Sequence, residues 1–526
     1  MGSKHLFISH SPYIGGSNTK TSMVPYILAI DAGTTSSRAI VFDKDTKKIG
    51  LGQFEFTQHF PDNSWVEQDA NEIWATQQKA ITAALKAAKI KATDISAIGI
   101  TNQRETTIIW DRVTGEPIYN TIVWQDRRTS NYCSSLSNET VAIVAKKTGL
   151  IVDAYFSASK IRWILHKVEG AAERAARGEL CFGTVDSWLI YKLTGGASHI
   201  TDASNASRTM LYNINHGGWD QELCDLFQVP IAILPEVVNS SGNLATTDEG
   251  VFGATVPISG IAGDQQAALF GQLCFSIGEA KNTYGTGCFA MSNTGDQIVR
   301  STNKMLSTVA WQIDGKLTYA LEGSVYVAGS LVQWLRDGMG LFEKSADVEE
   351  LALQEKNNGG ITIIPALTGL GAPHWDSYAR GAIMGITRGT NTSHIAYAAL
   401  ESIALSTADV LEAMAKDMGE NLKSIKVDGG ASTNDTMMQI QSDLLGCLVI
   451  RPMETESTAL GAALLAGLGT GIWSGLDELK ELAAIDQKFT PADSDFTLLR
   501  QQWKKGINSS KGWIEADVHE SIRIDH

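Results

Sequence analysis

Several short segments combine a carboxylate with small residues and hydroxyl side chains, a combination that can hold phosphate groups. The first is DAGTTSSR (residues 31–38), in which Asp31 ends an apolar run. Successive backbone N–H groups in such a glycine turn can form an anion site, and Thr34, Thr35 and Ser36 add hydroxyl donors. An ordinary hairpin turn has the same composition, so this segment alone leaves both interpretations open.

Two more glycine turns occur in the second half of the chain, TYGTGCF (residues 283–289) and VDGGAS (residues 427–432). Each also suits a plain turn, but three such turns at strand ends favour a nucleotide site, where Gly429 and Gly430 would leave room for a ring or a ribose. GGSNTKTS (residues 15–22) is not a phosphate loop, because it lacks the glycine before the lysine and has no strand before it or helix after it.

The segment GIAGDQQAALFG (residues 260–271) places Asp264 where an apolar strand gives way to a helix. Aspartate at such a junction is commonly a helix N-cap. It is also the group that an alcohol needs when it attacks a γ-phosphate, since a carboxylate can orient the hydroxyl and accept its proton. The local sequence leaves both roles open.

Composition limits the classes of protein to consider. The chain has 526 residues, 43% of them hydrophobic, which predicts two to four domains. A net charge of -15 argues against a nucleic-acid partner. The six cysteines form no metal-ligand spacing, which indicates free thiols in a reducing compartment, and no apolar run is long enough for membrane insertion. We therefore expect a cytoplasmic protein, with residues 1–22 a disordered leader and residues 516–526 a tail.

The sequence of the first half predicts strands followed by a long helix. Residues 26–56 predict a three-strand antiparallel meander. Asp69 and Glu72 form a capping-box signature before a helical pattern at residues 73–90. Two short strands follow, at residues 96–101 and 106–111. This order predicts a layered α/β domain.

The second half repeats this order, with strand, turn and strand at residues 279–293, a helix at 393–418 and a strand at 424–430. Each half also contains a helix start rich in small residues, at 264–271 and 457–467, which would let two helices approach closely. The repetition predicts an internal duplication with a boundary near residues 270–278. We therefore predict domains at residues 23–274 and 275–515.

Together these residues resemble the FGGY carbohydrate kinases of the actin, hexokinase and Hsp70 ATPase superfamily, and among them the members that phosphorylate glycerol. The resemblance runs from about residue 26 to 473. It is strongest at TNQRET (101–106), VWQDRRT (123–129), YFSASK (155–160), GIAGDQQAALFGQ (260–272) and YGTGCF (284–289). It implies two α/β domains of ribonuclease-H-like type, as in actin-like ATPases, with an interdomain cleft.

The resemblance also implies roles for individual residues. Arg104 and Glu105 would grip the glycerol hydroxyls, which suits a polyol because charged donors and acceptors can replace water at each hydroxyl. Neighbouring residues of a strand point to opposite faces, so both reach one pocket only if the chain bends after Gln103. The alternative is a surface ion pair. Three aromatic residues match positions that line the pocket, although each taken alone would suit a core: Trp124, Tyr155 and Phe289.

By the same resemblance Asp264 is the general base, Gln265 a further glycerol contact, and Asp31 with Asp264 the carboxylates that help hold Mg²⁺, partly through water. The residues that match phosphate-binding positions are Thr34, Thr35, Ser36 and Arg38. Those that match other ATP-binding positions are Thr286, Gly329, Gln333, Gly430 and Asn434.

The expected reaction is phosphoryl transfer from Mg-ATP to glycerol. A kinase for a larger polyol or ketose, and a non-catalytic actin-fold ATPase, are the alternatives. The resemblance implies a homodimer or homotetramer. Some relatives bind an inhibitory sugar bisphosphate through an arginine or are phosphorylated on a histidine; Thr255 stands at the arginine position and residues 245–253 contain no histidine, so neither regulation is expected.

Overall fold

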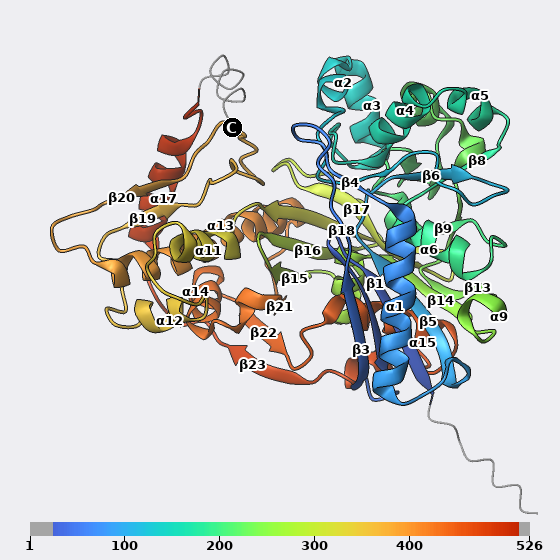
Figure 1. Cartoon of the computed structure of the whole chain (residues 1–526). Helices are drawn as coiled ribbons and strands as arrows, with labels where there is room; N and C mark the ends of the chain where they lie inside the picture. The colour runs from blue at the N-terminus through green and yellow to red at the C-terminus, as the bar shows by residue number, and fades with distance from the viewer. Residues whose placement is uncertain (1–24, 515–526) are drawn as a thin grey trace, which may run out of the picture.

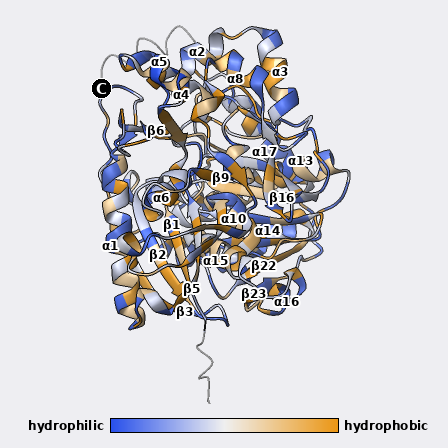
Figure 2. Ribbon diagram, turned by 90° about the vertical axis from the view of Figure 1, so that its right-hand side faces the viewer, coloured by the Kyte–Doolittle hydropathy of each residue, from blue (hydrophilic) through white to orange (hydrophobic). Residues whose placement is uncertain are grey.

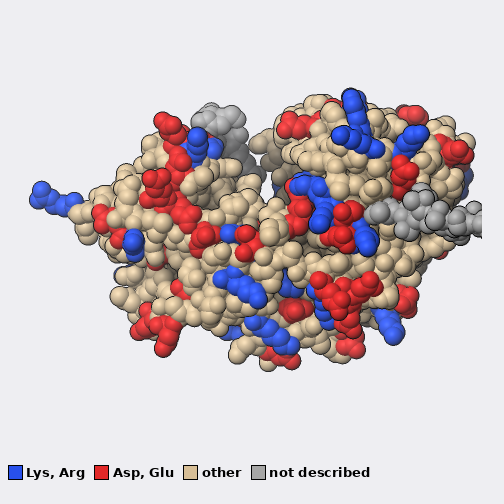
Figure 3. All heavy atoms as spheres, turned by 90° about the horizontal axis from the view of Figure 1, so that it is seen from below, with Lys and Arg blue, Asp and Glu red and all other residues tan. Residues whose placement is uncertain are grey.

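The computed structural model of the protein describes residues 25–514. The predicted leader, the rejected GGSNTKTS segment and the predicted tail lie outside the described residues. Within residues 25–514, none of the helices combines the length and hydrophobicity needed to span a bilayer. All six cysteines are buried and unpaired, as expected. Figure 3 shows acidic and basic side chains interspersed on the face seen from below.

One 13-stranded sheet runs through both halves of the described chain (Figure 1). In order across the sheet, the strands are β23 (Ile485–Phe489), β22 (Leu448–Pro452), β21 (Ser424–Asp428), β15 (Glu279–Tyr284), β16 (Cys288–Gly295), β18 (Lys316–Val325), β17 (Leu306–Ile313), β13 (Ser241–Thr246), β14 (Pro257–Gly263), β5 (Ile95–Asn102), β1 (Tyr26–Ala32), β2 (Ser36–Phe42) and β3 (Lys48–Glu55). The halves join where β13 and β17 pair at Ser241 and Ile313.

The two halves share one topology. The order β3-β2-β1-β5-β14 recurs as β18-β16-β15-β21-β22. In each series the first two neighbouring pairs are antiparallel and the next two are parallel. The predicted meander, the predicted strands at residues 96–101 and 106–111, and the strand pair at 279–293 are confirmed, as is the repeat of element order.

Equivalent helices connect the equivalent strands. α1 (Ala70–Ala88) precedes β5, and α13 (Thr392–Met418) precedes β21; α10 (Asp264–Gly271) follows β14, and α15 (Ser457–Gly469) follows β22. Asp69 caps α1 by accepting a hydrogen bond from the Asn71 N–H, as predicted. Glu72 accepts instead from the Thr57 hydroxyl, so the second bond of the expected capping box is not made. In Figure 2 the central strands are largely hydrophobic, whereas α1 alternates between hydrophilic and hydrophobic residues.

Helices α10 and α15 cross at very short range, as their small residues predict. A Cβ added to Gly461 would lie 1.8 Å from the Ala267 carbonyl oxygen. α15 also packs under β1, β5 and β14, where a Cβ on Gly99 would lie 2.0 Å from the Ala462 carbonyl oxygen. A helix from the second half of the chain therefore completes the core under the first half of the sheet. The domain boundary at residues 274 and 275 falls between α10 and β15 and stays a prediction.

Each half carries further elements outside the repeated unit. In the first half a cap with its own hydrophobic cluster (Figure 1, upper right) includes β4 (Glu67–Gln68), β6 (Ile108–Asp111), β7 (Thr121–Ile122), α2 (Ser130–Ser135), α3 (Asn138–Thr148), α4 (Ser157–Lys167), α5 (Ala171–Ala176), β8 (Leu180–Gly183) and α8 (Gln221–Phe227). By contrast, α6 (Val185–Leu193) and β9 (Ile200–Asp202) pack in the core with β1, β5 and α1, and α7 (Ala203–Ala206) packs in a separate small cluster. Those of the second half include α11 (Gly329–Asp337), α12 (Asp347–Ala352), β19 (Thr362–Ile364), β20 (Ala382–Met384), α14 (Asp435–Leu445), α16 (Leu476–Glu481) and α17 (Thr497–Ser510).

Candidate active site

Asp264 is the first residue of α10, directly after β14. Gly263 occupies the N-cap position, so Asp264 is not the N-cap that one interpretation of the sequence expected. Its carboxylate accepts a hydrogen bond from the Gln265 N–H at 2.7 Å and lies 3.0 Å from Arg104 Nε, with 31% of the side chain exposed. A Cβ on Gly263 would lie 2.7 Å from Arg104 Cδ, so glycine is needed for Arg104 to pass. The carboxylate is thus held beside a cation and remains accessible.

The bend predicted after Gln103 is present. β5 ends at Asn102, and Glu105 has a left-handed backbone with φ of 60°. Both side chains of the Arg104–Glu105 pair are buried, with 2% and 1% exposed. The pair is therefore not a surface ion pair, and both charges lie in the interior of the molecule.

Two charged residues that the sequence did not single out complete this cluster. Arg208 donates through Nε to Glu105 at 2.7 Å and through Nη2 to Glu322 at 2.9 Å. Glu322 also pairs with Arg104 Nη1 at 2.5 Å. Burial opposes the ionisation of Glu322, but the two arginines prevail and lower its pKa to about 2. We refer to Arg104, Glu105, Arg208 and Glu322 as the buried charge cluster.

Two of the predicted aromatic residues lie together. The rings of Trp124 and Tyr155 meet edge to face with centroids 5.6 Å apart, and Trp124 Nε1 donates to the Thr34 hydroxyl at 3.0 Å. Phe289 lies on β16 two residues from Met291, which pairs with Glu322, so Phe289 and Glu322 are on the same face of the sheet. Trp124 thus adjoins the first glycine turn, and Tyr155 lies beside the buried charge cluster, with its ring centroid 5.9 Å from Arg208 Cζ.

The turn between β1 and β2 holds the predicted phosphate-binding residues at its tip. The Gly33 N–H bonds to the Ser36 carbonyl oxygen at 3.0 Å, and Thr35 is exposed. Arg38 Nη2 lies 2.6 Å from Asp31, and its Nη1 lies 2.5 Å from Glu456, which precedes α15. The guanidinium expected to neutralise phosphate is therefore already paired with one carboxylate from each half.

The donor set fits Mg²⁺ carried by phosphate better than a metal cage. No group of three or more His, Cys, Asp or Glu residues among residues 25–514 could hold a metal ion alone. Magnesium typically binds one or two carboxylates together with substrate phosphates and water. Asp31 and Asp264 are near enough to interact: burial raises the pKa of Asp31, Arg38 opposes this, and the charge of Asp264 raises it further.

All five other predicted ATP-binding residues line one cavity of about 420 Å³ in the second half, a size that suits a small-molecule ligand. These residues are Thr286, Gly329, Gln333, Gly430 and Asn434. Two glycines allow its walls to approach closely. A Cβ on Gly329 would lie 2.7 Å from the Gly285 carbonyl oxygen, and a Cβ on Gly429, whose φ is 85°, would lie 2.5 Å from the Tyr284 carbonyl oxygen. The turns predicted at residues 283–289 and 427–432 therefore meet at this cavity.

The sequence analysis also missed two buried lysines, one inside the YFSASK motif and one two residues before TYGTGCF. Lys160, in YFSASK, donates to the carbonyl oxygens of Tyr155 and Phe156, and burial lowers its pKa to about 8. Lys281 donates to the Gln265 side-chain oxygen and to the Thr283 hydroxyl. Gln265, a predicted glycerol contact, is thus held from the second half of the chain.

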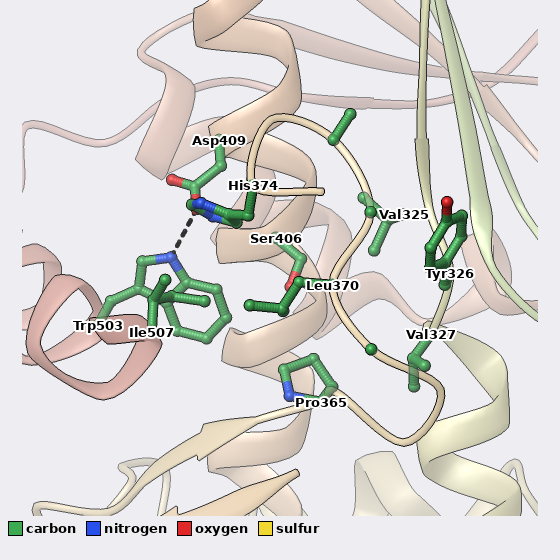
Figure 4. Close-up of a pocket in the computed structure, with 13 residues that line it drawn as sticks. Val325, Tyr326, Val327, Pro365, Leu370, His374, Ser406, Asp409, Trp503 and Ile507 are labelled. Atoms are coloured by element: carbon green, nitrogen blue, oxygen red, sulfur yellow. Dashed lines mark hydrogen bonds and ion pairs between the residues drawn. The ribbon is translucent and has the colours of Figure 1, made fainter. Parts of the chain in front are cut away.

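A second cavity, of about 20 Å³, contains none of the predicted residues and has room for about one water molecule (Figure 4). On its wall Asp409 accepts from Trp503 Nε1 at 2.8 Å and lies 3.2 Å from His374 Nε2. It is a packing junction between α13, α17 and the loop that carries His374.

The sheet repeats its topology in two halves, with a buried charged pair in one half and a glycine-lined cavity in the other, which suits a two-lobed protein that binds small molecules. Comparison with known proteins gives the family. Residues 26–271 match the N-terminal domain and residues 280–470 the C-terminal domain of the FGGY family of carbohydrate kinases, and the chain belongs to this family.

Relatives and solved structures agree with this assignment. The chain is 57% identical to the glycerol kinase of Deinococcus radiodurans, covering 93% of this chain and 98% of the relative, and 54% identical to that of Petrotoga mobilis, covering 94% and 100%. A solved Plasmodium falciparum glycerol kinase with ADP superimposes with a TM-score of 0.87 at 35% identity, covering 93% and 98% of the two chains. A gluconate kinase of Lactobacillus acidophilus (TM-score 0.81, 21% identity, covering 95% and 99%) shares the fold. The predicted fold class is confirmed.

Proposed function

We propose that this protein is an ATP-dependent glycerol kinase, which transfers the γ-phosphoryl group of ATP to a terminal hydroxyl of glycerol and yields sn-glycerol 3-phosphate and ADP. The observation that carries the proposal is the accessible Asp264 carboxylate 3.0 Å from Arg104, itself part of a buried pair with Glu105. The glycerol kinases that match nearly the full chain at more than half identity support the same reaction.

In this proposal the first half of the molecule recognises the polyol, together with Phe289 of β16 in the second half. Arg104 and Glu105 donate to and accept from two hydroxyls, because together they offer the polar partners that water would provide. Gln265 contacts a further hydroxyl, and Trp124, Tyr155 and Phe289 form an apolar wall against the carbon chain. The phosphoryl acceptor is thereby oriented toward Asp264.

Asp264 then acts as the general base. Its carboxylate orients the terminal hydroxyl and accepts its proton as the oxygen attacks the γ-phosphorus in line with the leaving ADP oxygen. Bound Mg²⁺ would neutralise charge on the transferring phosphoryl group, with Asp31 and Asp264 as the residues that hold it, partly through water. Arg38 and the turn residues Thr34, Thr35 and Ser36 would contact the phosphates.

The second half binds the nucleotide in the 420 Å³ cavity. Thr286 and Gly329 would lie along the phosphates, and Gln333, Gly430 and Asn434 along the ribose and base. We further propose a cytoplasmic location, supported by six buried, unpaired cysteines, and a homodimer or homotetramer, which light scattering would test.

A coupled ADP-release assay with a panel of polyols and ketoses tests the reaction. We expect kcat/KM to be highest for glycerol and ADP release to be negligible without an acceptor. Highest activity on a pentulose would replace the proposal with a kinase for a larger substrate, and acceptor-independent hydrolysis would replace it with an actin-fold ATPase.

A further inference from the structure

The buried charge cluster contains one residue from the second half of the chain, Glu322 of β18. Only 3% of its side chain is exposed, and both carboxylate oxygens are occupied by arginines of the first half. Oε2 pairs with Arg104 Nη1 at 2.5 Å, while Oε1 accepts from Arg104 Nη2 at 3.2 Å and from Arg208 Nη2 at 2.9 Å. One carboxylate therefore holds two guanidinium groups.

This arrangement fixes how Arg104 faces the proposed polyol site. Glu322 binds the Nη edge of the guanidinium, so Nε is not used for Glu322 and lies 3.0 Å from Asp264. A bidentate arginine–carboxylate pair also fixes the plane of the guanidinium. Without the carboxylate at position 322, Nη1 would keep its bond to Gln266 at 3.2 Å, but no bidentate pair would fix the plane of the guanidinium.

The same carboxylate acts on Glu105 through Arg208. Arg208 uses Nη2 for Glu322 and Nε for Glu105, at 2.9 and 2.7 Å. Its side chain is fully buried, and Gln266 adds a further contact to Arg104 Nη1 at 3.2 Å. The position of Glu105 therefore depends on an ion pair with the other half of the molecule.

We propose that Glu322 is a positioning residue of the polyol site: from β18 it holds Arg104 directly and Glu105 through Arg208, so that recognition of substrate hydroxyls depends on contact between the two halves. This inference rests on the proposed function. Glu322 itself need not touch the substrate. It lies on the strand next to β16, which carries Phe289, so one segment of the sheet contributes both the apolar wall and the anchor of the charged pair.

The test is Glu322→Gln, which keeps the shape and removes the charge, with kinetics for glycerol, 1,3-propanediol and ATP. We expect the KM for glycerol to rise about 10- to 100-fold, the effect of losing a charge-assisted hydrogen bond, and the KM for ATP to change by less than about threefold. The preference for glycerol over 1,3-propanediol, which lacks one hydroxyl, should fall by a similar factor. A purely structural carboxylate would not change this preference.

A matched control is Asp220→Asn. Asp220 is also a buried carboxylate with a lowered pKa: burial opposes its ionisation, but bonds from Lys147 and Asn213 bring its pKa down to about 2. Unlike Glu322, it lies in the cap, at the start of α8. This variant should lose stability without changing either KM.

If Glu322→Gln does not fold, Glu322→Asp tests the inference instead, because it keeps the charge on a shorter side chain. It should shift the glycerol KM in the same direction by a smaller factor. Wild-type activity on glycerol is measured first, so failure of the proposed reaction is distinguished from failure of this inference. If the wild type phosphorylates glycerol and a folded variant at position 322 keeps its glycerol KM and its preference over 1,3-propanediol, the inference is wrong.

Discussion

The two halves of the sheet share a strand order but differ in what they place at their strand ends. In the first half the chain after β5 bends into the buried Arg104–Glu105 pair, whereas after β21 it forms the glycine turn at residues 429 and 430. Charges suit a polyol that needs directional partners, and an open glycine-lined wall suits a flat nucleotide. The repeated unit thus supplies equivalent positions in the two halves, and under the proposed function the residues at those positions would recognise different substrates.

The two halves can also be compared at the start of α10, after β14, and at the start of α15, after β22. Each position has a carboxylate paired with an arginine. Asp264 pairs with Arg104, and Glu456 pairs with Arg38. Only the first pair adjoins the buried charge cluster, so the two carboxylates should differ greatly in their importance for turnover.

The largest effect is therefore expected for Asp264→Asn. We expect kcat to fall by about 10²- to 10⁴-fold, since the amide cannot accept the proton, while glycerol binding measured by calorimetry is largely retained. Glu456→Gln, at the equivalent junction, should reduce kcat by less than about tenfold, because its pair is partly exposed. Near-normal turnover of Asp264→Asn would remove it as the base.

The next prediction tests whether the halves are independent. Gly461→Val would force a side chain against the Ala267 carbonyl oxygen, which lies 1.8 Å from an added Cβ. We expect a loss of about 3 kcal/mol in the free energy of unfolding, seen as one transition that shifts as a whole in a thermal melt. Gly475→Ala, where an added Cβ meets no atom within 4 Å, is the control. Two separate transitions would show that α10 and α15 do not couple the halves.

A smaller effect is expected from Asp186, a buried carboxyl group of α6. Burial raises the pKa of Asp186 to about 7. Because the unfolded chain ionises near pH 4, stability from this group is present at low pH and is lost as pH rises from about 4 to 7. Asp186→Asn should therefore gain stability relative to wild type by roughly 1.4 kcal/mol for each pH unit between about pH 4 and 7, with no further gain above pH 7.

Thermal melts across this pH range would measure the gain. The amide can still bond Thr184 and Thr201, the partners of the carboxyl group, so little packing is lost. Glu401→Gln in α13 should follow the same trend, since burial also raises the pKa of Glu401 to about 7. A constant difference at all pH values would contradict the assignment.

Local patterns predicted most of the repeated unit from sequence. Alternating strands, glycine turns and the Asp69 cap all depend on neighbours in the chain, so the meander, α1 and α13 were found with ends within a few residues. The bend after Gln103 was expected only through the family resemblance, which places Arg104 and Glu105 in one pocket. The capping-box bond of Glu72 failed because the Thr57 hydroxyl competes for the same carboxylate.

The partners that cross between halves were not predictable in this way. Glu322 lies more than 200 residues from Arg104 and stands in an ordinary strand pattern, and nothing local marks it as charged in the interior. Arg208 likewise follows a short helix without a motif of its own. Buried polar contacts of this kind depend on how distant segments pack against each other, and local sequence patterns do not specify that packing.

The smallest expected effect concerns the nucleotide half alone. Gly430 lines the 420 Å³ cavity, and an added Cβ there meets no atom within 4 Å. Gly430→Val should therefore leave the melting temperature unchanged but occupy space needed by the ribose or base, raising the KM for ATP about five- to tenfold. The KM for glycerol should stay at its wild-type value, because the proposed polyol site contains the charged pair of the other half. If both KM values rose together, the halves would not divide recognition as their strand ends indicate.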